Sequence, residues 1–414
     1  MSDINKKVTM CVLALYIISA IAFECTENTA RISTIGIYLV FAVGVLHFAS
    51  TKQFFFNSHC ASLILLCLYI FILSFHNHNA MSETIAYYCL TCTVLCVFGY
   101  NLLFNFEKEK VIPMFLLVFI LGTIILDIRV IQSYGGISEI LEFSGNGIYE
   151  RRVGGDIINE NTLGLYNANS FFCCLVMFNK RKGHKFYWLY LAVSVLFVAM
   201  LLLTASKKAF TFLIAGMILF SILFLRNGKS KNKMAIFVFA ILAMAMIVYL
   251  IYNVPAFHSV RLRFNELFMT ISPDNSFVSE TDQTRLFMMR DGISAFTDSP
   301  IIGNGTAYSY TIFHGSYSHN NFVELLMNYG LIGFIIYYIP YVFLFTRLYT
   351  LIRQKDMYAL YFFIFVLMQV VLGVGWVNYY ERVIQLYTIF AAAYVENTNL
   401  KNNCMQHGSI YIKP

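Results

Sequence analysis

The feature that most constrains this chain is a series of uninterrupted apolar segments, each long enough to cross a lipid bilayer. A transmembrane helix needs about 20 consecutive apolar residues. Inside lipid only helices and closed barrels satisfy their own backbone hydrogen bonds, and these segments lack the alternation of barrel strands. The sequence therefore predicts an all-α polytopic integral membrane protein of about 12 transmembrane helices. We expect these helices at residues 7–23, 34–49, 61–76, 85–105, 111–132, 162–179, 186–203, 209–225, 234–252, 320–346, 356–376 and 382–396.

The composition supports this interpretation. Hydrophobic residues make up 59% of the 414 residues and charged residues only 12%, about half the charged fraction of a soluble protein. We find no internal repeat and no soluble segment, so residues 1–414 are expected to form one transmembrane domain surrounded by membrane lipids. The net charge of +7 does not by itself indicate a nucleic-acid partner, and none is expected.

Three cysteines, Cys89, Cys92 and Cys96, lie at helical spacing in one apolar segment. Such spacing could indicate metal ligands, but the segment has no histidine or acid beside them. Ordinary apolar packing is therefore favoured, and the cysteines do not suggest a disulfide framework.

The distribution of Lys and Arg predicts the orientation of the chain. Cytoplasmic loops collect basic residues because positive segments resist translocation. The short loops 180–185 and 226–233 carry four positive charges each, which places them, and with them both termini, in the cytoplasm. Two much longer segments, a central loop at 133–161 and a large loop at 253–319, are then expected on the opposite, periplasmic side.

Basic residues on the outer side gather in three places, at 151–152, 207–208 and 261–290. Long loops translocate regardless of their charge, so these clusters could be incidental. The alternative is an outer surface built to hold an anion. The charges alone leave both interpretations open.

His319 is the candidate general base. Ser318 is a good N-cap residue, which predicts that His319 lies in the first turn of a membrane-entering helix. The positive end of the helix dipole would disfavour a charged imidazole and keep His319 able to accept a proton. Gly330 and Gly333 would permit close helix approach. The alternative is a hydrated helix end at the membrane interface, in which His319, Asn320 and Asn321 contact water only.

Several basic residues are candidate anion ligands. Arg285 and Arg290 precede Pro300 and two glycines, which predicts a short helix at about 282–297 followed by a tight loop. A guanidinium group matches phosphate in a bidentate way, although these arginines could equally pair with lipid headgroups.

Two further groups lie at predicted helix ends. Lys207 and Lys208 follow Thr204 at the outer end of a helix, where lysine either binds phosphate or extends to the headgroups. Arg152 precedes a series of asparagines, Asn159, Asn161, Asn167 and Asn169. Such asparagines face the interior of a bundle, where they contact sugar hydroxyls or bond neighbouring helices.

In this order, the motifs resemble the O-antigen ligase and polymerase family of bacterial surface-polysaccharide assembly. The strongest match is His319, Asn320, nine residues, Gly330, two residues and Gly333. The stretch 284–292 followed by 299–305 resembles the arginine-to-glycine region of the family, and 152–161 is similar to a looser pattern in its central loop. The specific match covers about 284–333.

The resemblance implies a glycosyltransferase-C-like membrane enzyme that uses an undecaprenyl-pyrophosphate-linked oligosaccharide in the periplasm, with no metal or other cofactor. His319 would deprotonate the acceptor hydroxyl, and Arg285 would bind the leaving pyrophosphate. Lys207 stands where the family commonly has an arginine, and Lys208 could substitute for it. Arg152, Asn161, Arg290 and Asn320 would contact substrate. No acidic cluster with metal-ligand spacing appears in the outer loops.

The favoured hypothesis is a polymerase of lipid-linked repeat units for O-antigen or capsular polysaccharide, in the bacterial inner membrane, working with a chain-length regulator and a flippase. The close alternative is a ligase that transfers the finished polysaccharide to lipid A-core. A transporter or flippase is an alternative of another class, but inverted repeats and charges deep in the membrane, which are typical of transporters, are not found. A non-catalytic scaffold would tolerate loss of His319.

Overall fold

A computed structural model of the chain describes residues 3–23, 27–76, 79–104, 106, 108–145, 151–154, 157–181, 183–227, 248–271 and 280–407. Over these residues the regular structure is entirely helical, with sixteen helical elements, one of which is a short 3₁₀ helix. The all-α prediction is confirmed for this part of the chain.

The predicted transmembrane segments coincide with helices wherever the structure describes them. Of the segment 234–252, residues up to 247 lie outside the described residues, and 248–253 are helical. The other predicted segments correspond to α1 (Asp3–Phe23), α2 (Glu27–Thr51), α3 (Ser58–Ser74), α4 (Ala80–Phe104), α5 (Lys108–Ser133), α7 (Glu160–Lys180), α8 (Trp188–Leu203), α9 (Lys207–Asn227), α14 (Asn321–Arg353), α15 (Met357–Leu372) and α16 (Arg382–His407).

Among the described residues, four helical stretches are long and apolar enough to cross a membrane, and several shorter helices are also apolar. The long stretches are Ala30–Thr51, Ala80–Leu103, Val111–Ser133 and Asn321–Arg353. The shorter ones are Lys7–Phe23, Ser58–Ser74, Trp188–Leu203 and Met357–Leu372. This helix composition is that of a multi-pass membrane protein, while the number of about 12 spans stays a prediction.

The two long loops contain helices of their own. The predicted helix at 282–297 is confirmed as α12 (Glu280–Asp298), and turns follow it at 299–302. The loops also hold α6 (Ile137–Gly145), η1 (Pro255–Phe257), α11 (His258–Ile271) and α13 (Tyr308–Ile312). These four elements are absent from the sequence prediction because short helices outside the membrane lack a long apolar signal.

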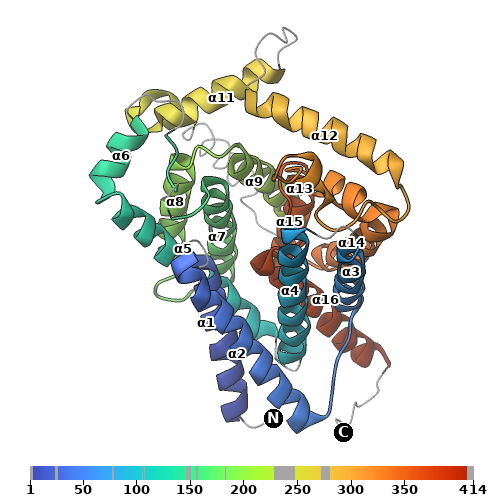
Figure 1. Cartoon of the computed structure of the whole chain (residues 1–414). Helices are drawn as coiled ribbons and strands as arrows, with labels where there is room; N and C mark the ends of the chain where they lie inside the picture. Colours follow the sequence, from blue (N-terminus) through green and yellow to red (C-terminus); the bar gives the residue numbers. More distant parts are fainter. Residues whose placement is uncertain are drawn as a thin grey trace. The chain divides into compact units, whose positions relative to one another are not determined.

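The chain divides into two compact units, each described here by itself. The first comprises Met1–Leu13, Ile37–Ile112 and Thr284–Pro414. In it, α3 packs against α4 and α14, α4 packs against α16, and α14 packs against α15 (Figure 1). Cys92 and Cys96 of α4 lie in an apolar cluster with Cys60 of α3 and Ile389 of α16, which confirms the packing interpretation for these two cysteines.

The second unit comprises Ala14–Gly36 and Pro113–Gln283. Its α7 packs against α8 and α9. Gly164 of α7 permits the close approach of α9, since a Cβ there would lie 2.6 Å from the Cβ of Ala209. The buried Asn167 donates to Asp127 of α5 at 2.9 Å, so this asparagine bonds a neighbouring helix, which was one of the two predicted alternatives.

Candidate functional site

A break in α14 at Gly330 receives the loop that follows α12. Gly330 has φ 60° and ψ −164°, so the helix is interrupted there. Beyond the break, the amide of Leu331 donates to the carbonyl of Pro300 at 2.9 Å, and the amide of Ile332 donates to that of Ile301 at 3.2 Å. The loop thus occupies the hydrogen-bonding groups that the broken helix exposes.

Glycine is required on both sides of this contact. A Cβ on Gly330 would lie 2.4 Å from the carbonyl oxygen of Ile301, and a Cβ on Gly303 would lie 2.4 Å from that of Asn328. A Cβ on Gly333 would lie 2.3 Å from the Cβ of Tyr329. Gly330 was expected to bring two helices together; instead it allows a break in one helix and the docking of a loop. Gly333 lies against Tyr329 and near Tyr69 of α3, a helix that packs against α14.

His319 lies immediately before α14 in a left-handed backbone conformation, with φ 56°. The N-cap is Asn320, whose side chain accepts from the amides of Phe322 and Val323 at 3.0 and 3.2 Å. The prediction that Ser318 caps the helix, with His319 in its first turn, is therefore wrong. Asparagine and serine are both strong caps, and the left-handed turn at His319 decides between them.

The buried Glu324 holds the segment that carries His319. Its Oε2 accepts from the backbone amide of Ser318 at 2.9 Å. Its Oε1 accepts from the hydroxyl of Ser309 at 2.6 Å and from the side-chain amide of Asn328 at 3.0 Å. One carboxyl group thus connects α13, the residue before His319 and the first two turns of α14.

A tyrosine of the first unit lies against His319, and charged side chains act on that tyrosine. The His319 ring packs against Tyr317, with 4.1 Å between ring centroids, and Tyr310 lies 6.5 Å from Tyr317. Burial raises the pKa of Tyr317, the carboxylates of Glu381 and Glu324 raise it further, and the Arg285 guanidinium of α12 opposes them. Arg285 and Glu381 therefore act electrostatically on the tyrosine that contacts His319.

The loop between α15 and α16 is fixed to the start of α14 through Asn321. The side-chain oxygen of the buried Asn321 accepts from the amides of Asn378 and Tyr379 at 2.9 and 3.2 Å. This places Tyr380 and Glu381, the next residues, close to the His319 segment. Burial raises the pKa of Tyr380 well above its ordinary value, and Tyr310 and Glu324 contribute, so the phenol stays neutral.

Arg290 is separated from this cluster. The buried residues Gly292 and Ala295 mark the face of α12 that packs against the unit. Arg285 lies 7 residues before Gly292 and 10 before Ala295, about two and three helical turns, so it shares that face. Arg290 is exposed on another face of the helix. The structure thus brings Arg285, but not Arg290, toward His319.

Arg152 and Asn161, in the second unit, form a clamp around the turn that precedes α9. The Arg152 guanidinium donates to the carbonyl of Thr204 at 3.1 Å and to the side chain of Asn161 at 3.0 Å. It also lies 3.4 Å from the carboxylate of Glu160. The hydroxyl of Ser206 donates to Asn161 at 2.8 Å. Through these contacts both residues hold the turn in place. Their contact with substrate stays a prediction.

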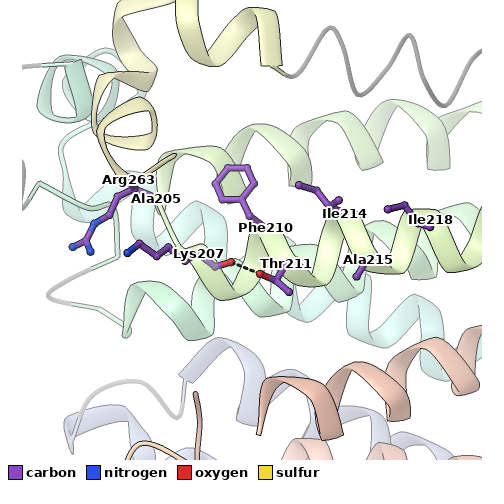
Figure 2. Close-up of a pocket in the computed structure, with 8 residues that line it drawn as sticks. All are labelled: Ala205, Lys207, Phe210, Thr211, Ile214, Ala215, Ile218 and Arg263. Carbon is purple, nitrogen blue, oxygen red and sulfur yellow. Dashed lines mark hydrogen bonds between the residues drawn. The ribbon is translucent and has the colours of Figure 1, made fainter. Parts of the chain in front are cut away.

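Lys207 and Lys208 begin α9 and are half-buried. Figure 2 shows Lys207 at one end of a groove that continues along α9, with Arg263 of α11 at the same end. Within the described residues, no group of three or more His, Cys, Asp or Glu side chains is arranged to hold a metal ion.

Sequence reasoning missed Glu324 and Glu381, and it gave Asn321 and Arg263 no role beyond a hydrated helix end and the basic segment 261–290. Glu324 gave a signal, because an acid in the first turn of an apolar helix is costly in a membrane unless it is bonded. Asn321 follows Asn320 in the motif, and spacing alone does not show which asparagine caps the helix and which bonds the loop between α15 and α16. Glu381 and Arg263 reach their places only through tertiary contacts.

These helices define a multi-pass membrane protein with a polar cluster at a helix end. Residues 192–338 match the family model described as O-antigen ligase, and the match includes Arg285, His319, Gly330 and Gly333. This part of the chain is thus an O-antigen ligase family domain, as the resemblance predicted. The family comprises glycosyltransferase-like membrane enzymes, ligases and polymerases, that act on lipid-linked polysaccharides. No curated protein matches the chain.

Proposed function

We propose that this protein is a polymerase of undecaprenyl-pyrophosphate-linked oligosaccharide repeat units for O-antigen or capsular polysaccharide. The observation that carries the proposal is the His319 cluster. An imidazole lies against a half-buried tyrosine, and an arginine is close enough to act electrostatically on that tyrosine. A base and a fixed cation are the two groups that transfer from a pyrophosphate donor requires.

The reaction places a specific demand on each group. The acceptor hydroxyl attacks the anomeric carbon of the chain-bearing donor, the bond from that carbon to the pyrophosphate oxygen breaks, and a new glycosidic bond forms. His319 takes the hydroxyl proton, and Arg285 neutralises the charge on the departing undecaprenyl pyrophosphate. A guanidinium suits this because it stays protonated and binds phosphate oxygens in pairs.

The backbone at His319 supports a functional role. A non-glycine residue with positive φ is uncommon and is retained where the surrounding structure imposes it. Here Glu324 and the Asn320 cap hold the residues on either side. Such a histidine is oriented before substrate arrives, which reduces the entropic cost of proton transfer.

We propose that the enzyme crosses the bacterial inner membrane about 12 times, with both termini in the cytoplasm and the His319 cluster in the periplasm. The basic loops 180–185 and 226–233 support this orientation. We also propose a glycosyltransferase-C-like, metal-independent enzyme that works beside a flippase and a chain-length regulator, because a polymerase needs a supply of translocated units and a limit to growth.

The test uses the purified protein in lipid vesicles, supplied only with undecaprenyl-pyrophosphate repeat units, with products separated on a gel. A ladder is expected from the wild type and not from His319→Asn. Asparagine tolerates positive φ, so this variant removes the base and keeps the backbone. His314→Asn is the matched control, because His314 is an exposed histidine with φ 52° in the same segment.

The matched family model is that of O-antigen ligases, which favours a second candidate. A ligase would give no ladder from repeat units alone and would transfer preformed polysaccharide once lipid A-core is supplied. If neither reaction occurs while the protein is folded, the proposed glycosyl transfer is wrong.

A further inference from the structure

A buried polar cluster of the second unit joins α5 to α7. Asp127 of α5 accepts a hydrogen bond from Nδ2 of Asn167 of α7 at 2.9 Å. The hydroxyl of Ser170 of α7 donates to the hydroxyl of Thr123 of α5 at 2.8 Å. Thr123 and Asp127 are four positions apart and Asn167 and Ser170 are three, so the two pairs lie about one helical turn from each other. All four side chains are buried.

The orientation of the Asn167 amide leaves its oxygen without a partner. Nδ2 donates to the carbonyl of Leu163 at 3.0 Å as well as to Asp127, so an exchange of nitrogen and oxygen would place the amide oxygen against two acceptors. Among the described residues, Oδ1 of Asn167 has no hydrogen-bond partner. A buried oxygen in this position is costly unless a donor or a cation reaches it.

Asp127 adds a carboxyl group that has no basic partner. Among the described residues, no ion pair joins it to a lysine, arginine or histidine. Arg129, two residues away, donates to the carbonyl of Ala22 and lies over the ring of Phe23. A buried carboxylate is strongly destabilising unless a positive charge compensates it. The Asn167 oxygen and the Asp127 carboxylate therefore both call for a cation at the same place.

The chemistry of the cluster selects the kind of cation. Carboxylate, amide and hydroxyl oxygens are ligands of hard cations. The Thr123 hydroxyl donates to the carbonyl of Phe119 at 3.1 Å, so it and the Ser170 hydroxyl still have lone pairs to offer. One carboxylate compensates one positive charge, so a monovalent ion leaves the cluster neutral, as a low-dielectric interior requires. The described residues hold no group of three or more acids, histidines or cysteines for a divalent metal.

We propose that Asp127, Asn167, Ser170 and Thr123 bind a monovalent alkali cation between α5 and α7. The ion contacts the Asp127 carboxylate and Oδ1 of Asn167, and the two hydroxyls supply further oxygens. Asp127 is 7% exposed, which gives the ion a way in. Bound there, the ion stabilises the packing of α7, the helix whose first turn carries Asn161 of the clamp before α9. The site is independent of the proposed glycosyl transfer.

The experiment measures binding of radioactive sodium to the purified full-length protein in detergent, with choline chloride keeping the ionic strength constant. The assay is run at about pH 8, where an exposed carboxyl group is ionised. The wild type is expected to bind sodium saturably, one ion per chain. Asp127→Asn keeps the size of the side chain and removes its charge, so binding should weaken at least about 10-fold. Thr123→Val removes one neutral ligand and should weaken binding roughly 3- to 10-fold.

Two control variants lie outside the cluster. Thr388 of α16 is buried like Thr123, and its hydroxyl likewise donates to the carbonyl four residues earlier, that of Ile384, at 2.9 Å. Thr388→Val is therefore matched to Thr123→Val. Asp298→Asn removes one carboxylate from the exposed end of α12 and is matched to Asp127→Asn in charge. Both controls should bind sodium like the wild type.

Absence of saturable sodium binding in the wild type, or equal binding by Asp127→Asn and Asp298→Asn, would overturn the proposal. Thermal unfolding gives a second measurement in case Asp127→Asn does not fold. Replacing choline chloride with sodium chloride should raise the melting temperature of the wild type and of Thr388→Val by several degrees, and that of Thr123→Val by less. If a lower pH raises the melting temperature and sodium does not, a proton occupies Asp127 and the cation site is refuted.

Discussion

The contact between Gly330 and the loop after α12 allows a quantitative prediction for Gly330→Ala. An alanine there would adopt φ 60° and ψ −164°, a region that costs a non-glycine residue about 1–3 kcal/mol. Its Cβ would also lie 2.4 Å from the carbonyl oxygen of Ile301, so the loop has to withdraw.

Withdrawal of the loop breaks the hydrogen bonds from Leu331 and Ile332 to the loop carbonyls, each worth about 1 kcal/mol. The sum is a loss of roughly 3–5 kcal/mol in the free energy of unfolding. The assay is unfolding of the purified protein in mixed micelles of increasing SDS fraction, followed by circular dichroism.

Gly315→Ala is the matched control. Gly315 also has positive φ, at 90°, but a Cβ there would meet nothing within 4 Å, so the variant should lose only about 1–2 kcal/mol of backbone strain. Because Gly303 meets the same contact from the other side, Gly303→Ala combined with Gly330→Ala should cost less than the sum of the single changes. If Gly330→Ala is no less stable than Gly315→Ala, the docking argument is refuted.

Three further predictions concern single side chains. Glu324→Gln places a donor where the carboxyl group accepts from Ser318, so kcat should fall at least about 10-fold with little change in KM; an unchanged kcat would show that Glu324 does not position His319. Burial raises the pKa of Tyr310 from 10.0 to about 12, and Glu324 contributes. The folded state thus favours the neutral phenol, and this contribution to stability is complete below pH 10.0 and is lost as the pH rises toward about 12. The melting temperature of Tyr310→Phe should therefore fall less than that of the wild type between about pH 9 and pH 11.5. Arg152→Gln should lower the free energy of unfolding by about 1.5–3 kcal/mol, whereas Arg151→Gln, which loses only a contact with a phenylalanine ring, should lose about 0.5–1 kcal/mol; equal losses would contradict the clamp around the turn before α9.

The sequence by itself determined the helical class, the membrane environment and most helix positions. Long apolar runs leave the backbone one way to satisfy its hydrogen bonds in lipid, so these properties depend on local composition alone. The motif at His319 also predicted the family, because its spacing is a local property. The helix at 282–297 followed from Pro300 and the glycines after it.

Only the tertiary structure decided what the individual polar residues do. Ser318 and Asn320 are both good caps, and the left-handed turn at His319 selects Asn320. From the sequence, Gly330 could permit either close helix packing or a helix break. The contact with the loop after α12 shows that it permits the break. Arg263 reaches the groove beside Lys207 from another helix. In each case the partner is distant in sequence, so no local pattern carries the information.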